Sequence, residues 1–173
     1  MIRKATQADL NAVSEIYDHI HEQERQHKLC IGWIPNVYPT RTTAQNALAR
    51  HDLFVYEKDG TVLASAIINQ EQVDVYAGGE WRYKAPDREV MVLHTLVVEP
   101  SAAAHGIGRA FAGFYESYAR EAGCSVLRID TNAKNAVARR FYEKLGYLEA
   151  GIVPCCFNGI PDVQLVLLEK AIV

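Results

Sequence analysis

An apolar segment in the middle of this chain runs through a short glycine-bearing turn into a long amphipathic helix, and few folds accommodate that succession. Residues 89–98 read EVMVLHTLVV and are apolar on both faces, as expected of a strand at the centre of a sheet. Residues 107–122 carry apolar side chains at helical spacing, and Gly123 ends the helix. Such a buried strand followed by a helix predicts an α/β fold.

Helical and strand patterns alternate along the rest of the chain. Its 173 residues have the length of one domain, and Asp59-Gly60 between two apolar runs indicates a hairpin. We therefore expect a single α/β domain over residues 1–173 with the order β-α-α-β-β-β-α-β-α-β-β. The expected strands are 2–5, 53–57, 62–68, 89–98, 125–131, 147–153 and 163–169, and the expected helices are 7–28, 41–50, 107–122 and 136–145.

Composition excludes several functional classes. The net charge of −3 argues against a general nucleic-acid-binding protein, which normally carries an excess of basic residues. No apolar run approaches the roughly 18 residues of a membrane span, and the first residues lack an apolar signal region. The four cysteines have no CxxC spacing, and free thiols are typical of a reducing compartment. We therefore expect a cytoplasmic protein that binds neither nucleic acid nor membrane.

The turn after residues 89–98 has the composition of an anion-binding loop. Gly106 and Gly108 stand where a helix begins, so that several backbone N–H groups point the same way and the helix dipole adds partial positive charge. Glycines leave room there for phosphate oxygens. Neither G-x-x-x-x-G-K-[ST] nor a Rossmann fingerprint is present, since Phe111 occupies the position of its last glycine. A pyrophosphate site and a plain strand-to-helix turn are therefore both alternatives.

A second motif follows the strand at 125–131. Asn135 stands at the start of the helix at 136–145, where its side chain caps the helix or contacts a ligand. Ala138 keeps one helix face thin, and Tyr142 lies one turn further along that face. Tyr142 therefore offers a phenol to whatever lies against this face, and the alternative is a half-buried tyrosine with a satisfied hydroxyl.

The segments LVVEPSAAAHGIGRAF and NAVARRFYEKLGY, about 30 residues apart, resemble the GCN5-related N-acetyltransferase (GNAT) family. The resemblance covers nearly the whole chain and implies a mixed central sheet with a splayed parallel strand pair flanked by helices. It implies acetyl-CoA as co-substrate, with its pantetheine arm between the splayed strands, and Tyr142 as the general acid at the thioester sulfur. The implied cofactor-binding residues are Leu96, Val97, Val98, Ala104, His105, Gly106, Ile107, Gly108, Arg109, Asn135, Ala138 and Tyr142.

The turn departs from the family pattern at two positions. Ala103 stands where the family usually has Arg or Gln, and Ala104 stands where it often has a glycine. If position 104 requires a positive φ, alanine there costs roughly 1–2 kcal/mol. Gly106 and Gly108, the pair expected to lie closest to the phosphates, match the pattern. We expect weakened or differently braced binding of acetyl-CoA rather than its loss.

Acetyl transfer to an amine requires a neutral nucleophile. Only about one amine in 2,500 with a pKa of about 10.4 is neutral at pH 7, a cost of roughly 4.6 kcal/mol, so a general base matters more than a general acid. Glu89 and His94, on the strand at 89–98, are the candidates for this base. A hydrogen-bonded structural histidine, an exposed glutamate and a base that acts through water are the alternatives.

The resemblance implies an acceptor site among segments rich in aromatic residues, which suit a small, partly apolar amine or a peptide amine. Aromatic packing beneath long loops is the alternative. Few acidic residues lie there (Glu71, Asp74 and Glu80), so a polycationic acceptor is not favoured. The aromatic residues are Trp33, Tyr38, Tyr76, Trp81 and Tyr83, joined by a predicted loop of Cys155-Cys156-Phe157-Asn158.

Histidines recur along the predicted helix at 7–28, but their spacing does not match a metal-binding motif. His19, His21 and His27 lack the HExxH pattern, and we expect a solvated helix face and no metal.

We therefore expect an acetyl-CoA-dependent N-acetyltransferase in which a primary amine attacks the thioester directly in a ternary complex. The amide of Val98 would hold the oxyanion, and Tyr142 would protonate the departing thiolate. The alternatives are a non-catalytic acyl-CoA-binding or sensing protein of the same fold and an acyltransferase that uses another acyl-CoA donor. Retention of Tyr142 argues against a pure binding protein. Family members often dimerise, so a homodimer is among the expected assemblies.

Overall fold

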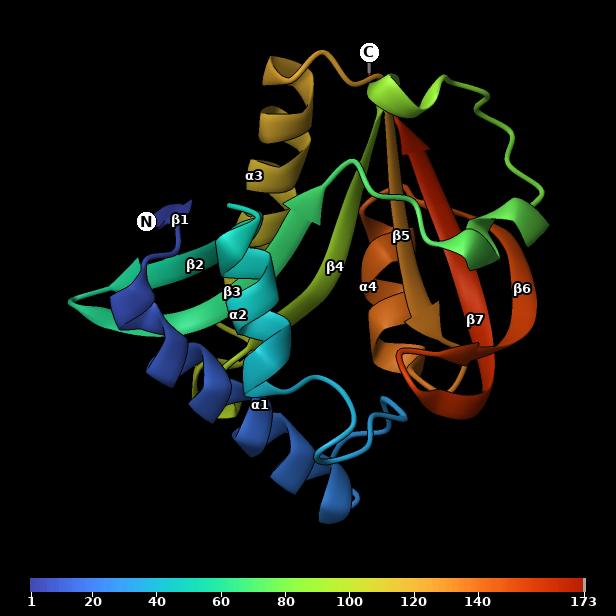
Figure 1. Cartoon of the computed structure of the whole chain (residues 1–173). Helices are drawn as coiled ribbons and strands as arrows, with labels where there is room; N and C mark the ends of the chain where they lie inside the picture. The colour runs from blue at the N-terminus through green and yellow to red at the C-terminus, as the bar shows by residue number, and fades with distance from the viewer. Residues whose placement is uncertain (173) are drawn as a thin grey trace.

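The computed structural model describes residues 1–172, and its centre is one seven-stranded sheet with the order β1-β2-β3-β4-β5-β7-β6 (Figure 1). The β4–β5 pair is parallel, and the other neighbouring strands are antiparallel. The strands are β1 (Ile2–Lys4), β2 (Leu53–Lys58), β3 (Thr61–Asn69), β4 (Val90–Val98), β5 (Val126–Asn132), β6 (Leu148–Phe157) and β7 (Ile160–Ala171). The helices are α1 (Leu10–Arg25), α2 (Arg41–Ala49), α3 (Ile107–Glu121) and α4 (Ala136–Lys144).

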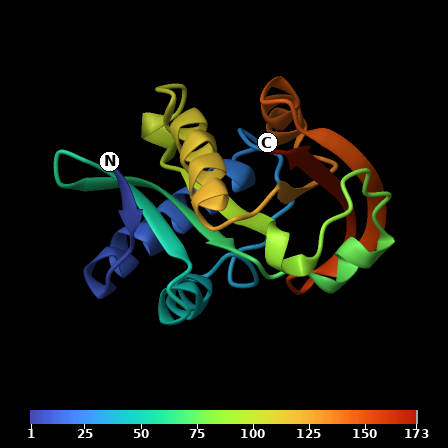
Figure 2. The same cartoon turned by 90° about the horizontal axis from the view of Figure 1, so that it is seen from above.

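Helices cover both faces of the sheet, as the view from above shows (Figure 2). α1 and α2 pack on one face, where they bury Leu53, Val55 and Ile67. α3 and α4 pack on the opposite face of β3, β4 and β5, and residues 70–87 complete the first face beside β5 and β7. Within residues 1–172, none of the helices combines the length and the apolar character that a membrane span requires.

The parallel pair β4–β5 separates part of the way along its length. Pairing between the two strands runs from Val90 opposite Val126 to Leu93 opposite Ile129. Beyond these residues β4 stays with β3 and β5 stays with β7, so the two strands diverge toward their carboxyl ends (Figure 1). The expected mixed sheet with a splayed parallel pair is therefore confirmed.

A bulge in β4 lies just after the point of separation. Ser65 of β3 is opposite Val97 and Ile67 is opposite His94, so two residues of β4 stand against one residue of β3. Thr95 accordingly has a φ of 51°, which is uncommon for a β-branched residue. A bulge bends the strand that carries it, and this bulge lies where β4 leaves β5.

The element order expected from the sequence is confirmed, with differences at the ends of some elements. The expected helix at 7–28 begins as a 3₁₀ turn at Gln7–Asp9 and ends at Arg25. Asp9 accepts hydrogen bonds from the Thr6 amide (2.7 Å) and from Arg3 (2.8 and 2.9 Å). The Arg3 guanidinium lowers the pKa of Asp9 to about 2, so polar contacts fix this first turn.

The last hairpin is longer than expected, and the prediction of a loop at Cys155-Cys156-Phe157-Asn158 is wrong. β6 continues through Phe157 and β7 begins at Ile160, so Asn158 and Gly159 alone turn the chain. Both residues have positive φ (51° and 79°), as a two-residue type I′ turn requires. Asn-Gly is the favoured pair for this turn, and the flanking residues therefore pair as strands.

Candidate active site

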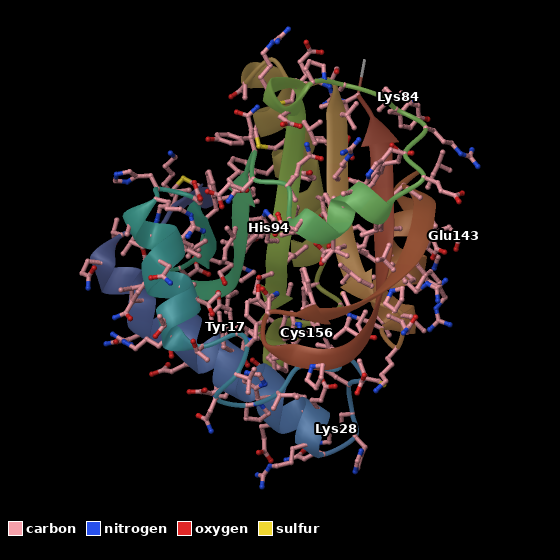
Figure 3. The ribbon with its side chains drawn as sticks, turned by 45° about the vertical axis from the view of Figure 1, so that its right-hand side comes forward. Tyr17, Lys28, Lys84, His94, Glu143 and Cys156 are labelled. Carbon is pink, nitrogen blue, oxygen red and sulfur yellow. The ribbon has the colours of Figure 1, made fainter. Side chains whose placement is uncertain are left out.

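A cavity of about 1210 Å³ follows the gap between β4 and β5. One side is formed by the turn before α3 and by α4, and the other by residues 27–33, α2 and the β6–β7 hairpin. Figure 3 shows His94 near the middle of the sheet, and the hairpin that carries Cys156 curves across the view below it. All of the predicted cofactor-binding residues line this cavity except His105, whose exposed ring lies near the Ala102 carbonyl (3.3 Å).

The start of α3 presents backbone amides toward the cavity. Gly106 is the N-cap residue and has the left-handed conformation (φ 77°). The first helical hydrogen bond runs from the Ala110 amide to the Gly106 carbonyl (2.9 Å). The amides of Ile107, Gly108 and Arg109 therefore lack helical partners, as is usual in a first turn. These amides and the positive end of the helix fit a pyrophosphate group.

Ala104 occupies a strained backbone position in the same turn. Its φ is 64°, so the cost of roughly 1–2 kcal/mol foreseen for an alanine there applies. Ala103 has an ordinary φ of −62°. Glu99 holds the turn from the other side, because its carboxylate accepts from the Ser101 hydroxyl (3.2 Å) and contacts His19 (2.8 Å).

The edge of β4 that faces the gap offers backbone groups without a strand partner. Glu99 donates its amide to the Leu63 carbonyl (2.8 Å), on the β3 side. Because amides alternate in direction along a strand, the amide of Val98 points into the gap. Leu96, Val97 and Val98 all line the cavity there.

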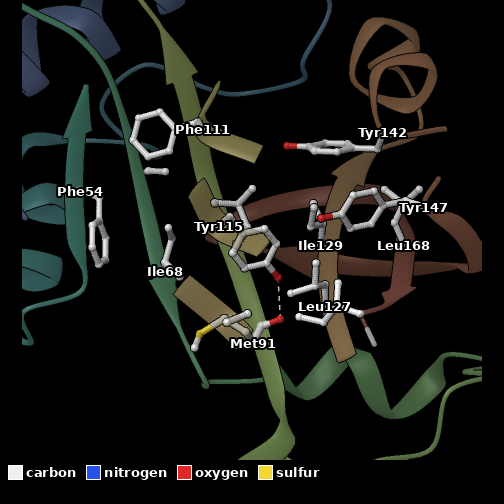
Figure 4. Close-up of a cluster of buried hydrophobic side chains, with 14 of the residues drawn as sticks. Phe54, Ile68, Met91, Phe111, Tyr115, Leu127, Ile129, Tyr142, Tyr147 and Leu168 are labelled. Carbon is white, nitrogen blue, oxygen red and sulfur yellow. Dashed lines mark hydrogen bonds between the residues drawn. The ribbon is translucent and has the colours of Figure 1, made fainter. Parts of the chain in front are cut away.

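Tyr142 reaches the cavity from α4. Asn135 caps this helix by accepting a hydrogen bond from the Ala138 amide (3.1 Å), which sets the face on which Tyr142 lies. Figure 4 shows the Tyr142 hydroxyl pointing from α4 toward β4. Burial raises the pKa of Tyr142 well above the ordinary tyrosine value. The phenol therefore keeps its proton at neutral pH and can donate it.

His94 is held by a chain of polar contacts that the sequence does not reveal. Arg50 donates to Asp52 (2.8 Å), Asp52 accepts from the side-chain amide nitrogen of Asn69 (3.0 Å), and the Asn69 oxygen lies 3.0 Å from His94 Nε2. Asp52 fixes the orientation of the Asn69 amide, so Nε2 carries the proton and Nδ1 keeps its lone pair. Burial, reinforced by the nearby Arg50 charge, lowers the pKa of His94 to about 4.

Asp130 carries a half-buried carboxylate on the wall of the same cavity, and sequence reasoning does not single it out. It follows Ile129, the last β5 residue paired with β4, just as His94 follows Leu93. The Tyr76 hydroxyl donates to its Oδ2 (2.8 Å), and burial raises the pKa of Asp130 to about 6. A lone acid in an apolar strand was the available signal, but Tyr76 lies 54 residues away in the chain.

Glu89 and His94 are not brought together. Glu89 lies at the opposite end of β4, in a 3₁₀ turn where it accepts a hydrogen bond from the Ser125 hydroxyl (3.3 Å), and it does not line the cavity. Pairing with β5 places the start of β4 away from the gap. Of the two candidates for the base, His94 is therefore the one that the geometry retains.

The predicted aromatic residues divide between the cavity and the core. Trp33 and Tyr38 line the cavity, and the Tyr38 hydroxyl is hydrogen bonded to Thr95. Trp81 donates a hydrogen bond to the Tyr76 carbonyl (2.7 Å), and the Arg128 guanidinium carbon lies 3.9 Å from the centroid of its ring. Trp81 therefore contributes to the packing of the segment 70–87. Tyr83 belongs to the same packed cluster.

The histidines of α1 make separate contacts. His21 is buried, not solvated as expected, and its Nε2 lies 2.9 Å from the Pro39 carbonyl. His19 is exposed and pairs with Glu99. Over residues 1–172, no cluster of three or more His, Cys, Asp or Glu side chains has an arrangement suited to a metal ion.

Comparisons with known proteins agree on one family. The sequence model described as the acetyltransferase (GNAT) family matches residues 12–147. An uncharacterized N-acetyltransferase of Methanocaldococcus jannaschii is 24% identical over 171 residues, which cover 98% of this chain and 92% of that protein. A mycothiol acetyltransferase of Cellulomonas flavigena is 29% identical over 96 residues, or 56% of this chain, and the match spans only 26% of that longer relative.

Solved structures share the fold at low sequence identity. A ribosomal-protein-alanine N-acetyltransferase from Brucella melitensis has a TM-score of 0.71 and 22% identity, with 99% of each chain covered. An acetyltransferase from Salmonella typhimurium, solved with its cofactor acetyl-CoA, has a TM-score of 0.67 and 23% identity, with 99% of this chain and 92% of that chain covered. At these identities the likeness concerns the fold.

Proposed function

The chain belongs to the acetyltransferase (GNAT) family, and on this basis we propose that it transfers the acetyl group of acetyl-CoA to an amine. The observation that carries the proposal is the cavity through the splayed strands. It has a protonated phenol, Tyr142, on the α4 side and two titratable groups, His94 and Asp130, at the level where β4 and β5 separate. An acid and a proton acceptor on opposite sides of one gap suit acyl transfer from a thioester.

The residues of the turn would hold the nucleotide end of the co-substrate. The amides from Ala104 to Arg109 suit its pyrophosphate, and the free edge of β4 at Leu96 to Val98 suits the amide groups of its pantetheine arm. Acetyl-CoA held by these residues would supply the thioester on which the other cavity residues act. Asn135 and Ala138 form the wall of the gap on the α4 side.

The chemistry then falls to three groups of this chain. His94 Nδ1, which is unprotonated at neutral pH, accepts a hydrogen bond from the amine and orients it toward the thioester carbon. The amide of Val98 stabilises the negative charge that develops on the carbonyl oxygen. Tyr142 gives its proton to the departing thiolate. No acetylated residue is required, because the amine attacks directly.

A non-catalytic acyl-CoA-binding protein and an acyltransferase for another donor are the alternatives. The strained Ala104 is the observation that favours weaker binding of the nucleotide end. A pure binding protein has no use for a phenol at the sulfur. Comparison of acetyl-, propionyl- and succinyl-CoA in a thiol-release assay separates the two alternatives from the main proposal.

The first experiment is calorimetric titration with acetyl-CoA, with dephospho-CoA and ATP as comparisons. We expect micromolar binding of acetyl-CoA, followed by release of free thiol in the presence of an amine panel. Absence of detectable binding would mean that the Ala103-Ala104 turn no longer holds a pyrophosphate, and the enzyme proposal would fail.

We also propose a cytoplasmic location. All four cysteines, Cys30, Cys124, Cys155 and Cys156, are free thiols. Free thiols are stable in a reducing compartment, which supports this location.

A further inference from the structure

Asp130 combines three properties that are rarely found together. It is half-buried, its carboxylate lines a cavity, and none of the ion pairs among residues 1–172 includes it. Removing a carboxylate from water without a cation is costly. A carboxylate that is retained in such a place is suited to a cation that arrives from the cavity.

The protein satisfies one side of this carboxylate and leaves the other for a ligand. Tyr76, a buried residue of the segment 70–87, donates a hydrogen bond from its hydroxyl to Oδ2 (2.8 Å). Among the described residues, no hydrogen bond from the protein reaches Oδ1. Tyr76 therefore fixes the orientation of the carboxylate, and Oδ1 is available to the cavity.

The cavity that Asp130 lines also has aromatic and apolar side chains on its walls. Trp33 and Tyr38 approach from the segment before α2, with their rings edge to face at 6.0 Å. Phe157, Ile160 and Val163 approach from the β6–β7 hairpin. Aromatic faces attract cations, and apolar side chains accommodate a hydrocarbon body.

We propose that Asp130 binds the ammonium group of the acceptor and takes its proton, and that the acceptor is a cationic amine on an apolar body. This inference rests on the proposed acetyl transfer. The ammonium N–H donates to Oδ1 and its proton passes to the carboxylate, which leaves a neutral amine. The nitrogen lone pair then forms the C–N bond, the C–S bond breaks, and the thiolate takes the Tyr142 proton. The second proton lost by the nitrogen restores Tyr142, and Asp130 releases its proton to water, so one proton is released per turnover.

Among the titratable groups that face the cavity near Asp130, only Asp130 itself is expected to titrate near pH 6. Burial raises the pKa values of Tyr76, Tyr142 and the Cys155 thiol. Burial also raises the pKa of Tyr38, to about 12. His94, on the neighbouring strand, has its pKa lowered to about 4. The acid limb of kcat/KM against pH is therefore expected near pH 6, where Asp130 becomes a carboxylate.

The test compares Asp130→Asn with the wild type on a matched pair of acceptors. The pair is 2-phenylethylamine, which is an ammonium ion at pH 7, and its β,β-difluoro analogue, whose fluorines lower the basicity of the amine. We expect Asp130→Asn to reduce kcat/KM about 100-fold or more for 2-phenylethylamine and far less for the fluorinated amine, and to abolish the acid limb near pH 6. Tyr76→Phe should move that limb to higher pH, because its hydroxyl lowers the pKa of Asp130.

Asp74→Asn is the matched control, since it removes an equal charge from an exposed position in the same turn as Tyr76, outside the cavity. Calorimetric binding of acetyl-CoA should be the same in all four proteins. If the wild type releases no thiol with any amine, the proposed function itself fails. If the wild type turns over and Asp130→Asn keeps its KM, its pH profile and its preference between the two amines, the role of Asp130 is refuted.

Discussion

Tyr142 is buried and His94 is half-buried beside the same cavity, yet loss of water contact leaves the two side chains with opposite capacities. A buried site disfavours the charged form of any group. The neutral form of tyrosine carries a proton, so burial raises the pKa of Tyr142 and preserves a donor. The neutral form of histidine has a free lone pair, so burial lowers the pKa of His94 and preserves an acceptor. One physical effect thus produces an acid and an acceptor at neutral pH.

The role of Tyr142 can be separated from its packing by removing the hydroxyl alone. We expect Tyr142→Phe to lower kcat by roughly 100-fold, the lower range for a general acid, with little change in the Kd of acetyl-CoA. Tyr147→Phe is the control, because Tyr147 is buried 5.5 Å from Tyr142 (ring centroids) and does not line the cavity. Equal kcat values in the two variants would remove Tyr142 from the reaction.

At the scale of elements, the turn between β4 and α3 carries the clearest departure from ideal geometry. Ala104 adopts φ 64°, a conformation that glycine adopts freely and that alanine adopts only at a cost in free energy. We expect Ala104→Gly to increase the free energy of unfolding by about 0.5–1 kcal/mol, because the relieved strain exceeds the added freedom of the unfolded chain. Urea denaturation measures this change, and titration with acetyl-CoA measures whether affinity rises with it.

Ala103→Gly is the matched control for this turn. Its φ of −62° suits alanine, so glycine there adds only freedom to the unfolded chain, and we expect a loss of about 0.4–1 kcal/mol. The two substitutions remove the same methyl group from adjacent residues and should change stability in opposite directions. A destabilised Ala104→Gly would contradict the strained geometry at this position.

Helices, strands and turns could be predicted from the sequence where their signal lies in residues close in the chain. Site residues could not be predicted where they depend on contacts between distant residues. The Asp59-Gly60 turn and the stripe on α3 depend on residues close in the chain, so both are found where expected. The Asn158-Gly159 turn also had a local signal, but its flanking cysteines do not alternate like a typical strand. The contact between Tyr76 and Asp130 depends on a register that no local pattern encodes.

At the scale of the whole molecule, the shifted pKa values of two cavity residues contribute to the free energy of unfolding. His94 and Asp130 both line the cavity just beyond the last paired residues of β4 and β5. The folded chain holds His94 at a pKa of about 4 against an ordinary 6.5, and Asp130 at about 6 against an ordinary 3.8. Each difference corresponds to about 3 kcal/mol.

The two contributions oppose each other as pH changes. Between pH 4 and 6.5 the unfolded chain binds more protons at His94 than the folded chain does, so stability from this group rises with pH. Between pH 4 and 6 the folded chain binds more protons at Asp130, so stability from this group falls with pH. The wild type is therefore expected to show little net pH dependence from these two groups over that range.

Single substitutions should uncover each contribution in turn. We expect the free energy of unfolding of His94→Gln to fall by about 2 kcal/mol from pH 4 to pH 6, because Asp130 then acts alone. That of Asp130→Asn should rise by about 3 kcal/mol from pH 4 to pH 6.5, because His94 then acts alone. Asp9, with its pKa held at about 2, affects stability mainly below pH 4 and is common to all three proteins. Urea denaturation at several pH values measures these slopes, and slopes of the same sign in the two variants would show that the cavity does not hold the groups in opposite protonation states.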